Sequence, residues 1–205
     1  MNLKESIIQF LPKYLSETEQ KKLLAEIKAF PKNLDSRFYT DHLREELIVF
    51  QGDGISGLKV SNLPSEKFIE AKCIITSNTC DTDRRNQRHF RSRLTYCPLI
   101  DFEKYIDSLL QYGIDKTKIA NHSEAIKRQE VTQILFLPAN SKTKECIVFL
   151  DRVNNCDLNA LSSENIKKSR LFTLSNYGFY MFLLKLSISF TRIGEGVDRK
   201  IPTDN

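Results

Sequence analysis

The chain has 205 residues, of which 40% are hydrophobic and 28% are charged, and its formal net charge is +5. A chain of this length and composition can bury a hydrophobic core, which excludes a largely disordered protein. The first residues include Glu5 and no apolar stretch that leads into small residues, so we expect no secretory signal and a cytoplasmic location. The longest apolar stretch, from Tyr177 to Phe190, contains Lys185 and is shorter than the roughly 20 residues that span a bilayer, so we expect no membrane partner.

Helical patterns dominate the N-terminal part of the chain. Residues 3–11 place apolar side chains on one helical face and are followed by Pro12, which ends or kinks a helix. Ser16–Glu19 has the sequence of a capping box, and the helix that it begins should stop before Pro31. Residues 1–45 are therefore predicted to be an N-terminal helical arm.

From Glu46 onward the hydrophobic period changes to that of β-strands, with turn residues between the runs. The predicted strands are Leu47–Phe50, Ile55–Val60, Phe68–Thr76, Arg93–Cys97, Val131–Leu137 and Cys146–Leu150. A polar connection of hairpin length joins the last two. Short helices are expected at Phe102–Leu110, where Gly113 ends the helix, and at about Asn121–Gln129.

The last predicted element is a helix over Asn176–Thr191, which Ser175 should cap and which is apolar nearly all round. Short strands with mainly antiparallel connections, too few for a sandwich, favour a small half-open β-barrel. The fold class is therefore predicted as α+β: a curved, mainly antiparallel sheet, N-terminal helices and a buried C-terminal helix. Residues 46–192 form the barrel domain in this prediction, and residues 193–205 form a flexible tail.

Metal and disulfide chemistry are not expected. The five cysteines are an odd number, and none belongs to a Cys-x-x-Cys pair; they are Cys73, Cys80, Cys97, Cys146 and Cys156. This pattern argues against both a disulfide framework and a zinc knuckle. His42, His89 and His122 are each isolated from other ligands, so the sequence predicts no metal and no cofactor.

The most unusual segment is an apolar strand that ends in the small polar residues Ser77, Asn78, Thr79, Cys80 and Asp81. Strand ends that open onto loops often present functional groups. The alternative is structural, because Asn and Asp side chains also bind nearby backbone N–H groups and hold tight turns. A cysteine nucleophile at this strand end is disfavoured, because no carboxamide is identifiable that would orient a histidine base.

Five arginines lie within ten residues of one another: Arg84, Arg85, Arg88, Arg91 and Arg93. A basic strip of this density suits phosphate backbones. The alternative is a solvated loop that nearby aspartates partly balance. Arg91 and Arg93 occupy alternate positions, so they should share one face of the strand that Arg93 begins. Arg152, which follows the last predicted strand, is a further charge at a strand end.

Three segments resemble the MazF/PemK-type toxin family, whose members have an SH3-like barrel. They are Gly52–Ile55, the strand end Ile74–Asn78, and Leu137-Pro138 with the strand that leads into Val148–Asp151. The resemblance covers about Val49–Leu158. It implies metal-independent cleavage of single-stranded RNA and frequent homodimerisation. The chain is also similar to a group of uncharacterised bacterial proteins that share its Gln-Gly-Asp and Asn-Thr-Cys-Asp segments.

The sequence departs from the family pattern at both catalytic positions. Glu70-Ala71-Lys72 stands where the family has Arg-Pro, and Tyr96–Leu99 stands where it has threonines and serines. Two functions are therefore left open. One is an RNA-binding barrel of a bacterial toxin-antitoxin or defence system, which is also an endoribonuclease if it cleaves. The other is a non-catalytic sensor or adaptor in anti-phage (antiviral) defence, whose groove binds a protein encoded nearby.

Each function assigns roles to particular residues. For cleavage, the candidate catalytic residues are Asp81 as proton acceptor and Arg91 or Arg93 as phosphate ligands. The candidate residues for binding RNA or a partner are Asn78, Thr79, Cys80, Arg84, Arg85, Arg88 and Arg152.

Overall fold

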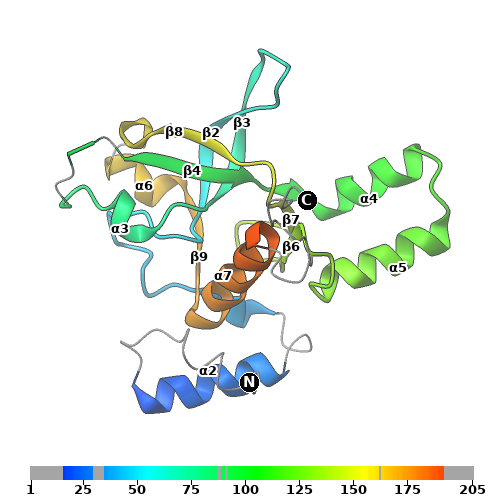
Figure 1. The fold of residues 1–205 in the computed structure, drawn as a ribbon, viewed down its shortest axis with the longest axis horizontal. Coiled ribbons are helices and arrows are strands. Elements are labelled where there is room, and N and C mark those ends of the chain that lie inside the picture. Colours follow the sequence, from blue (N-terminus) through cyan, green and yellow to red (C-terminus); the bar gives the residue numbers. More distant parts are fainter. Residues whose placement is uncertain (1–15, 30–34, 87–88, 91, 162, 192–205) are drawn as a thin grey trace, which may run out of the picture.

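A computed structural model of the chain describes residues 16–29, 35–86, 89–90, 92–161 and 163–191 (Figure 1). The predicted helix at residues 3–11 and the predicted tail at residues 193–205 lie outside these ranges. Among the described helices, none is both long and apolar enough to cross a membrane.

The strands form two antiparallel sheets. They are β1 (Tyr39–Thr40), β2 (Gly54–Ser61), β3 (Phe68–Ile75), β4 (Arg93–Pro98), β5 (Ile100–Asp101), β6 (Ile134–Leu137), β7 (Cys146–Phe149), β8 (Asn154–Asp157) and β9 (Arg170–Leu174). The larger sheet has the order β1-β9-β2-β3-β4-β8, and the smaller has the order β5-β7-β6. In the described part of the chain β1 and β8 are the two edges of the larger sheet, so the sheet does not close.

Helices surround these sheets. They are α2 (Glu17–Ala29), α3 (Thr79–Thr82), α4 (Phe102–Gln111), α5 (Lys116–Lys127), α6 (Ser163–Ser169) and α7 (Asn176–Thr191), with short 3-10 turns η1 (Ser36–Phe38) and η2 (Leu158–Ala160). Helices α4 and α5 project together from the sheets, and α7 lies near the centre of the molecule (Figure 1). The mixture of helices and antiparallel sheets confirms the α+β class.

Several local predictions are confirmed. In the capping box, Glu19 accepts a bond from the Ser16 amide at 2.8 Å, and Ser16 Oγ accepts from the Glu19 amide at 3.3 Å. Strand β3 pairs with both β2 and β4, as its apolar sequence predicts for a central strand. Strands β6 and β7 form the predicted hairpin. Gly113 follows the C-cap of α4, and its positive φ of 75° ends the helix as predicted.

Other predictions are wrong. The segment Leu47–Phe50 contains no strand, because its carbonyl groups bind side chains rather than a neighbouring strand. A single sheet from Val49 to Asp151 was expected, but the strands divide between two sheets, and the larger one also takes in β8 and β9 from later in the chain. The sequence analysis did not predict β9, whose partners β1 and β2 lie more than a hundred residues earlier.

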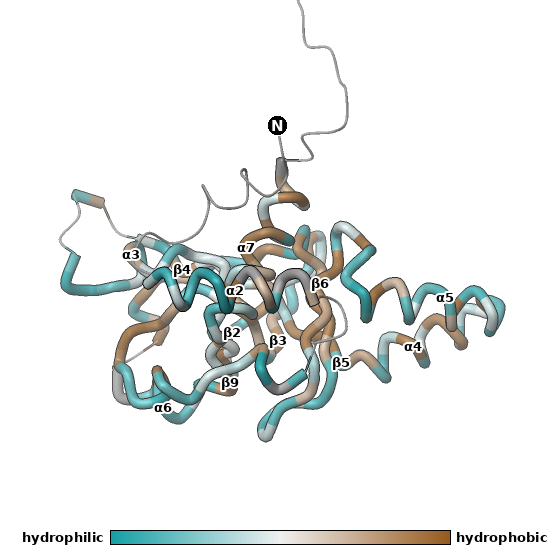
Figure 2. The backbone as a smooth tube through the Cα atoms, turned by 90° about the horizontal axis from the view of Figure 1, so that it is seen from below, coloured by the Kyte–Doolittle hydropathy of each residue, from teal (hydrophilic) through white to brown (hydrophobic). Residues whose placement is uncertain are grey.

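Helix α7 is buried over part of its length only. Tyr177 and Phe182 belong to the largest core cluster, together with side chains from both sheets and from η1. Leu184, Ile188 and Phe190 are exposed, so the helix is not buried on all sides. Figure 2 shows apolar segments gathered at α7 and β6, whereas the loop beyond α3 is hydrophilic over most of its length.

Candidate functional site

The polar segment at the end of β3 folds into the short helix α3. Asn78 is its N-cap, and Asn78 Oδ1 accepts a bond from the Cys80 amide at 2.9 Å. Thr79 Oγ1 accepts from the Gln51 amide at 3.0 Å. Asn78 and Thr79 thus hold a turn in this structure, which is the structural alternative that the sequence left open.

Hydroxyl groups join this strand end to β4. Thr95 Oγ1 lies 2.9 Å from both Thr76 Oγ1 and Ser77 Oγ, and Ser77 Oγ also donates to the Arg93 carbonyl oxygen at 3.3 Å. The bonds fix the start of β4 beside the end of β3. The backbone of Arg93 is therefore held next to the polar segment.

The turn Gln51–Asp53 packs on the same strand end. The Gly52 amide donates to the Ile75 carbonyl at 2.8 Å, and the Ile75 amide donates to the Asp53 carbonyl at 2.9 Å. Gln51 Nε2 donates to the Thr76 carbonyl at 2.8 Å. The Gln-Gly-Asp and Asn-Thr-Cys-Asp segments, which are 25 residues apart in the sequence, therefore form one unit in the structure.

Asp53 forms a buried ion pair with Arg170 of β9, with Nε and Oδ2 3.0 Å apart. The rest of the guanidinium binds backbone carbonyls: Nη1 donates to those of Leu43, Arg44 and Glu46 at 2.8–3.0 Å, and Nη2 donates to that of Ile48. The guanidinium thereby supplies hydrogen-bond donors for carbonyl groups that a neighbouring strand would otherwise pair. Residues 43–48 have a fixed conformation without regular secondary structure.

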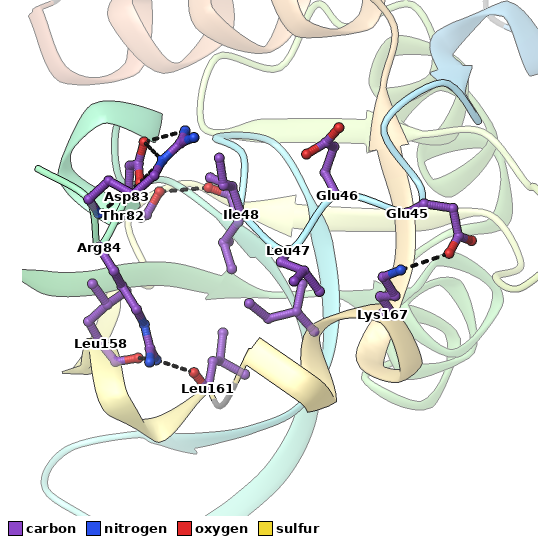
Figure 3. Close-up of a pocket in the computed structure, with 13 residues that line it drawn as sticks. Glu45, Glu46, Leu47, Ile48, Thr82, Asp83, Arg84, Leu158, Leu161 and Lys167 are labelled. Atoms are coloured by element: carbon purple, nitrogen blue, oxygen red, sulfur yellow. Dashed lines mark hydrogen bonds and ion pairs between the residues drawn. The ribbon is translucent and has the colours of Figure 1, made fainter.

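This clamped segment forms one wall of a pocket of about 470 Å³ (Figure 3). The Thr82 hydroxyl donates to the Val49 carbonyl at 2.6 Å and joins the segment to α3. The pocket is lined by Glu45, Glu46, Leu47, Ile48, Val49, Thr82, Asp83, Arg84, Arg85, Leu158, Leu161, Ile166 and Lys167. Arg170 holds the backbone of residues 43–48 by hydrogen bonds, so this wall of the pocket has a fixed position without a ligand.

Charged groups surround an apolar floor in this pocket. Arg85 pairs with Asp83 at 2.8 Å on one side, and Lys167 pairs with Glu45 at 3.0 Å on another. The lining contains three acidic and three basic side chains, so these charges cancel. Figure 3 shows Leu47 between the two ion pairs.

The described arginines of the strip are all exposed, but their side chains have different partners. Arg84 Nη2 donates to the carbonyls of Leu158 and Leu161 at 3.1 and 2.5 Å, which fixes this side chain along the pocket wall. The Arg85 side chain is 77% exposed. Arg93 is also exposed, and its Nε donates to Asn155 Oδ1 at 2.5 Å. Arg88 and Arg91 lie outside the described residues.

The remaining candidates lie on either side of this strip. Cys80 is exposed on α3, and Asp81, half-buried, donates its backbone N–H to the Asn78 carbonyl at 3.0 Å. Arg152 lies at the opposite end of the β4–β8 pair, over the ring of Phe149. The structure therefore gathers most of the candidates around α3 and the start of β4 and leaves Arg152 apart.

All five cysteines are free thiols. Burial raises the pKa of Cys73 and Cys97 to about 12, which makes both poor nucleophiles. Within the described ranges, no group of three or more histidine, cysteine or acidic side chains is placed to hold a metal ion.

Arg170 and the residues that line the pocket on the 43–48 segment and on α6 are not among the site residues predicted from the sequence. The Gly-Asp turn at Asp53 was noted, but its buried partner comes from a strand that was not predicted. A charged residue directly before the apolar run Leu171–Leu174 was the available signal. Comparison of the chain with protein-family models and with curated protein sequences gave no match.

Proposed function

We propose that the protein binds single-stranded RNA on the surface formed by the loop after α3 and the start of β4. The observation that carries this proposal is Phe90, which is 69% exposed on the same basic loop as Arg85 and three residues before Arg93. Single-stranded nucleic acids bind where basic side chains follow the backbone and aromatic rings stack on bases. Following the resemblance, we place this activity in a bacterial toxin or defence system.

Neither exposed arginine is committed to a strong partner. The Arg85–Asp83 pair lies at the surface, where an ion pair adds little to stability, so a phosphate can compete for the guanidinium. Arg93 bonds a neutral amide and keeps its full charge. Helix α3 and the hydroxyl bonds at the start of β4 hold the backbone on either side of the loop, so less conformational freedom is lost on binding.

Affinity for a labelled oligouridylate at several salt concentrations tests the proposal. Arg85→Ala and Arg93→Ala should each reduce the slope of log affinity against log salt by about 0.7, and Phe90→Ala should weaken binding about tenfold. Arg37→Ala is a matched control, because Arg37 pairs with Asp35 at 2.8 Å, two residues away, just as Arg85 pairs with Asp83. Equal affinity of all four variants would exclude this surface.

RNA cleavage is a separate part of the proposal. In the family that the chain resembles, cleavage needs no metal, and here Asp81 is the candidate proton acceptor and Arg93 is a candidate phosphate ligand. Asp81→Asn should abolish cleavage and leave RNA affinity unchanged, because the amide cannot accept the proton but can still hold the turn.

We also propose that the strands form a half-open SH3-like barrel. The pairing register of β2 shifts against both β3 and β9, and such irregularities bend a strand and curve its sheet.

The pocket supports a second candidate, a non-catalytic adaptor that binds a segment of a partner protein. Its lining has balanced charges and an apolar floor, which suits a peptide better than a phosphate backbone. Leu47, exposed at the pocket, is the residue to change. Leu47→Glu should weaken binding to the protein encoded beside this gene in a calorimetric titration, while RNA affinity should not change. If Leu47→Glu lowers RNA affinity instead, the pocket belongs to the RNA surface.

A further inference from the structure

Arg152 forms a stack at the end of the β4–β8 pair that is opposite Arg93. Its Cζ atom lies 4.0 Å from the centroid of the Phe149 ring, and its amide donates to the Phe149 carbonyl at 3.1 Å. A guanidinium is planar, so stacking on one ring leaves its other face and its N–H groups for a ligand. Arg152 is exposed and makes no ion pair with any described carboxylate.

Three elements hold this stack in place. The Tyr105 ring of α4 meets the Phe149 ring edge-on, with centroids 5.7 Å apart, and the Tyr105 hydroxyl lies 3.0 Å from Nε2 of His122 on α5. On the other side, Asn154 Nδ2 donates to the Arg152 carbonyl at 3.4 Å. The guanidinium is therefore presented on a platform that is fixed before any ligand arrives.

The strand β8 connects this platform with the proposed RNA surface. Arg93 is paired with Asp157 and Tyr96 with Asn154, so the five residue steps from Asp157 back to Arg152 span at most about 17 Å. An RNA strand with stacked bases covers this length with about five nucleotides, and an extended RNA strand covers it with fewer. Since β8 is an edge strand, no other described strand covers its outer side.

We propose that Arg152 is a second contact for the same RNA strand, which runs along β8 from Arg93. The outer face of the guanidinium stacks on a nucleobase, and its N–H groups donate to the adjoining phosphate. This inference rests on the proposed function. It adds a path along β8 and a minimum length for the bound RNA. In it, Arg152 stacks on a nucleobase and also binds a phosphate through its charge.

Binding of oligouridylates of two lengths tests the inference. Arg152→Ala should weaken binding of an oligonucleotide longer than about five residues roughly tenfold, and it should have less effect on one that is too short to reach from Arg93 to Arg152. Arg152→Lys should keep the salt dependence of binding but remain weaker than wild type, because an ammonium cannot stack on the base. Arg128→Ala is the control, since it removes an exposed arginine that pairs with Glu130.

The outcomes separate the two proposals. If Arg93→Ala weakens binding while Arg152→Ala behaves like Arg128→Ala, the proposed function stands and this inference is wrong. If wild-type protein binds no RNA of either length, both are wrong. If Arg152→Ala lowers the melting temperature, the RNA affinity of Arg152→Lys is the result that tests the inference, because the lysine retains a cation over the Phe149 ring. Affinity equal to that of wild type would then overturn it.

Discussion

At the scale of single residues, one buried arginine determines the shape of a segment that has no regular secondary structure. Arg170 is 2% exposed and binds Asp53 and four carbonyl groups of residues 43–48. A buried charge is tolerated only when it is paired and hydrogen-bonded, and here the guanidinium has both kinds of partner. The preformed pocket beside the arginine strip depends on this side chain.

Replacement of this arginine should be among the most destabilising changes in the protein. Arg170→Met leaves the Asp53 carboxylate buried without its partner, so the free energy of unfolding should fall by about 3–5 kcal/mol in a urea titration. Arg128→Met removes an arginine from an exposed pair and should lower the free energy of unfolding far less. Similar losses in the two variants would contradict the role given to the buried pair.

The sequence could not predict this pair. Arg170 follows Lys167 and Lys168 in a basic stretch, where it has the pattern of one more solvated cation. Its acceptors lie between 117 and 127 residues earlier in the chain. The cap at Asn78, in contrast, is a local feature. That Asn78 could hold a turn was predictable from the neighbouring residues alone.

At the scale of elements, helix α7 depends on close backbone contact with η1. A Cβ atom added to Gly178 would lie 2.2 Å from the carbonyl oxygen of Phe38, a backbone atom that cannot rotate away. Gly178→Ala should therefore lower the free energy of unfolding by about 1–3 kcal/mol, although alanine is the better helix former. Asn121→Ala, at an exposed position in α5, should be neutral or stabilising. Thermal unfolding of both variants checks the difference in sign.

The same helix also carries a buried cation. Lys185 Nζ donates to the carbonyls of Gln129 and Val131 at 2.8 and 2.5 Å, which ties α7 to the turn between α5 and β6. Gln129 has a positive φ of 60°, and its side chain bonds both backbone groups of Phe136. Burial lowers the pKa of the Lys185 ammonium from 10.5 to about 8.

Stability should therefore change with pH through Lys185. Its folded-state pKa lies below the unfolded value, so loss of the proton favours folding, and the contribution of Lys185 to stability should increase as the pH rises above 8. Between pH 8 and 9.5 this contribution should grow by at most about 1.5 kcal/mol, measured in urea titrations as the difference between wild type and Lys185→Met. Burial raises the pKa of the thiols of Cys73, Cys97 and Cys146, so their ionisation in the unfolded state lowers the stability of both proteins over the same range, and only the difference between the two reports Lys185. The same pH dependence in wild type and variant would refute this account.

Elements were predictable where the evidence for them is local. The hairpin of β6 and β7 and the helix α7 follow from apolar runs with turn or cap residues beside them. Strand β9 also contains apolar residues but directly precedes α7, and its partners β1 and β2 are distant in the chain. Division of the strands into two sheets depends on such distant pairings, which a period of two residues does not specify.

At the scale of the whole molecule, one core joins the N-terminal part of the chain to both sheets. Phe38 of η1, Ile74 of β3, Leu135 of β6 and Phe182 of α7 belong to the same buried cluster. Phe38 lies within residues 1–45, which the sequence analysis assigned to a helical arm, yet it is completely buried. Phe38 and Tyr39 thus help to form the core, and the proposed RNA surface around β4 lies on a body to which the N-terminal segment contributes.

Two phenylalanines distinguish this core from the proposed RNA surface. Phe38→Ala opens a cavity among fully buried side chains, so the free energy of unfolding should fall by about 3–5 kcal/mol. Phe90→Ala changes a mostly exposed ring and should leave stability within about 0.5 kcal/mol of wild type while weakening RNA binding. Urea titrations and RNA affinity, measured on both variants at a temperature where Phe38→Ala is still folded, check these opposite effects. Loss of RNA affinity in folded Phe38→Ala, with Phe90→Ala unaffected, would show that RNA binds elsewhere on the molecule.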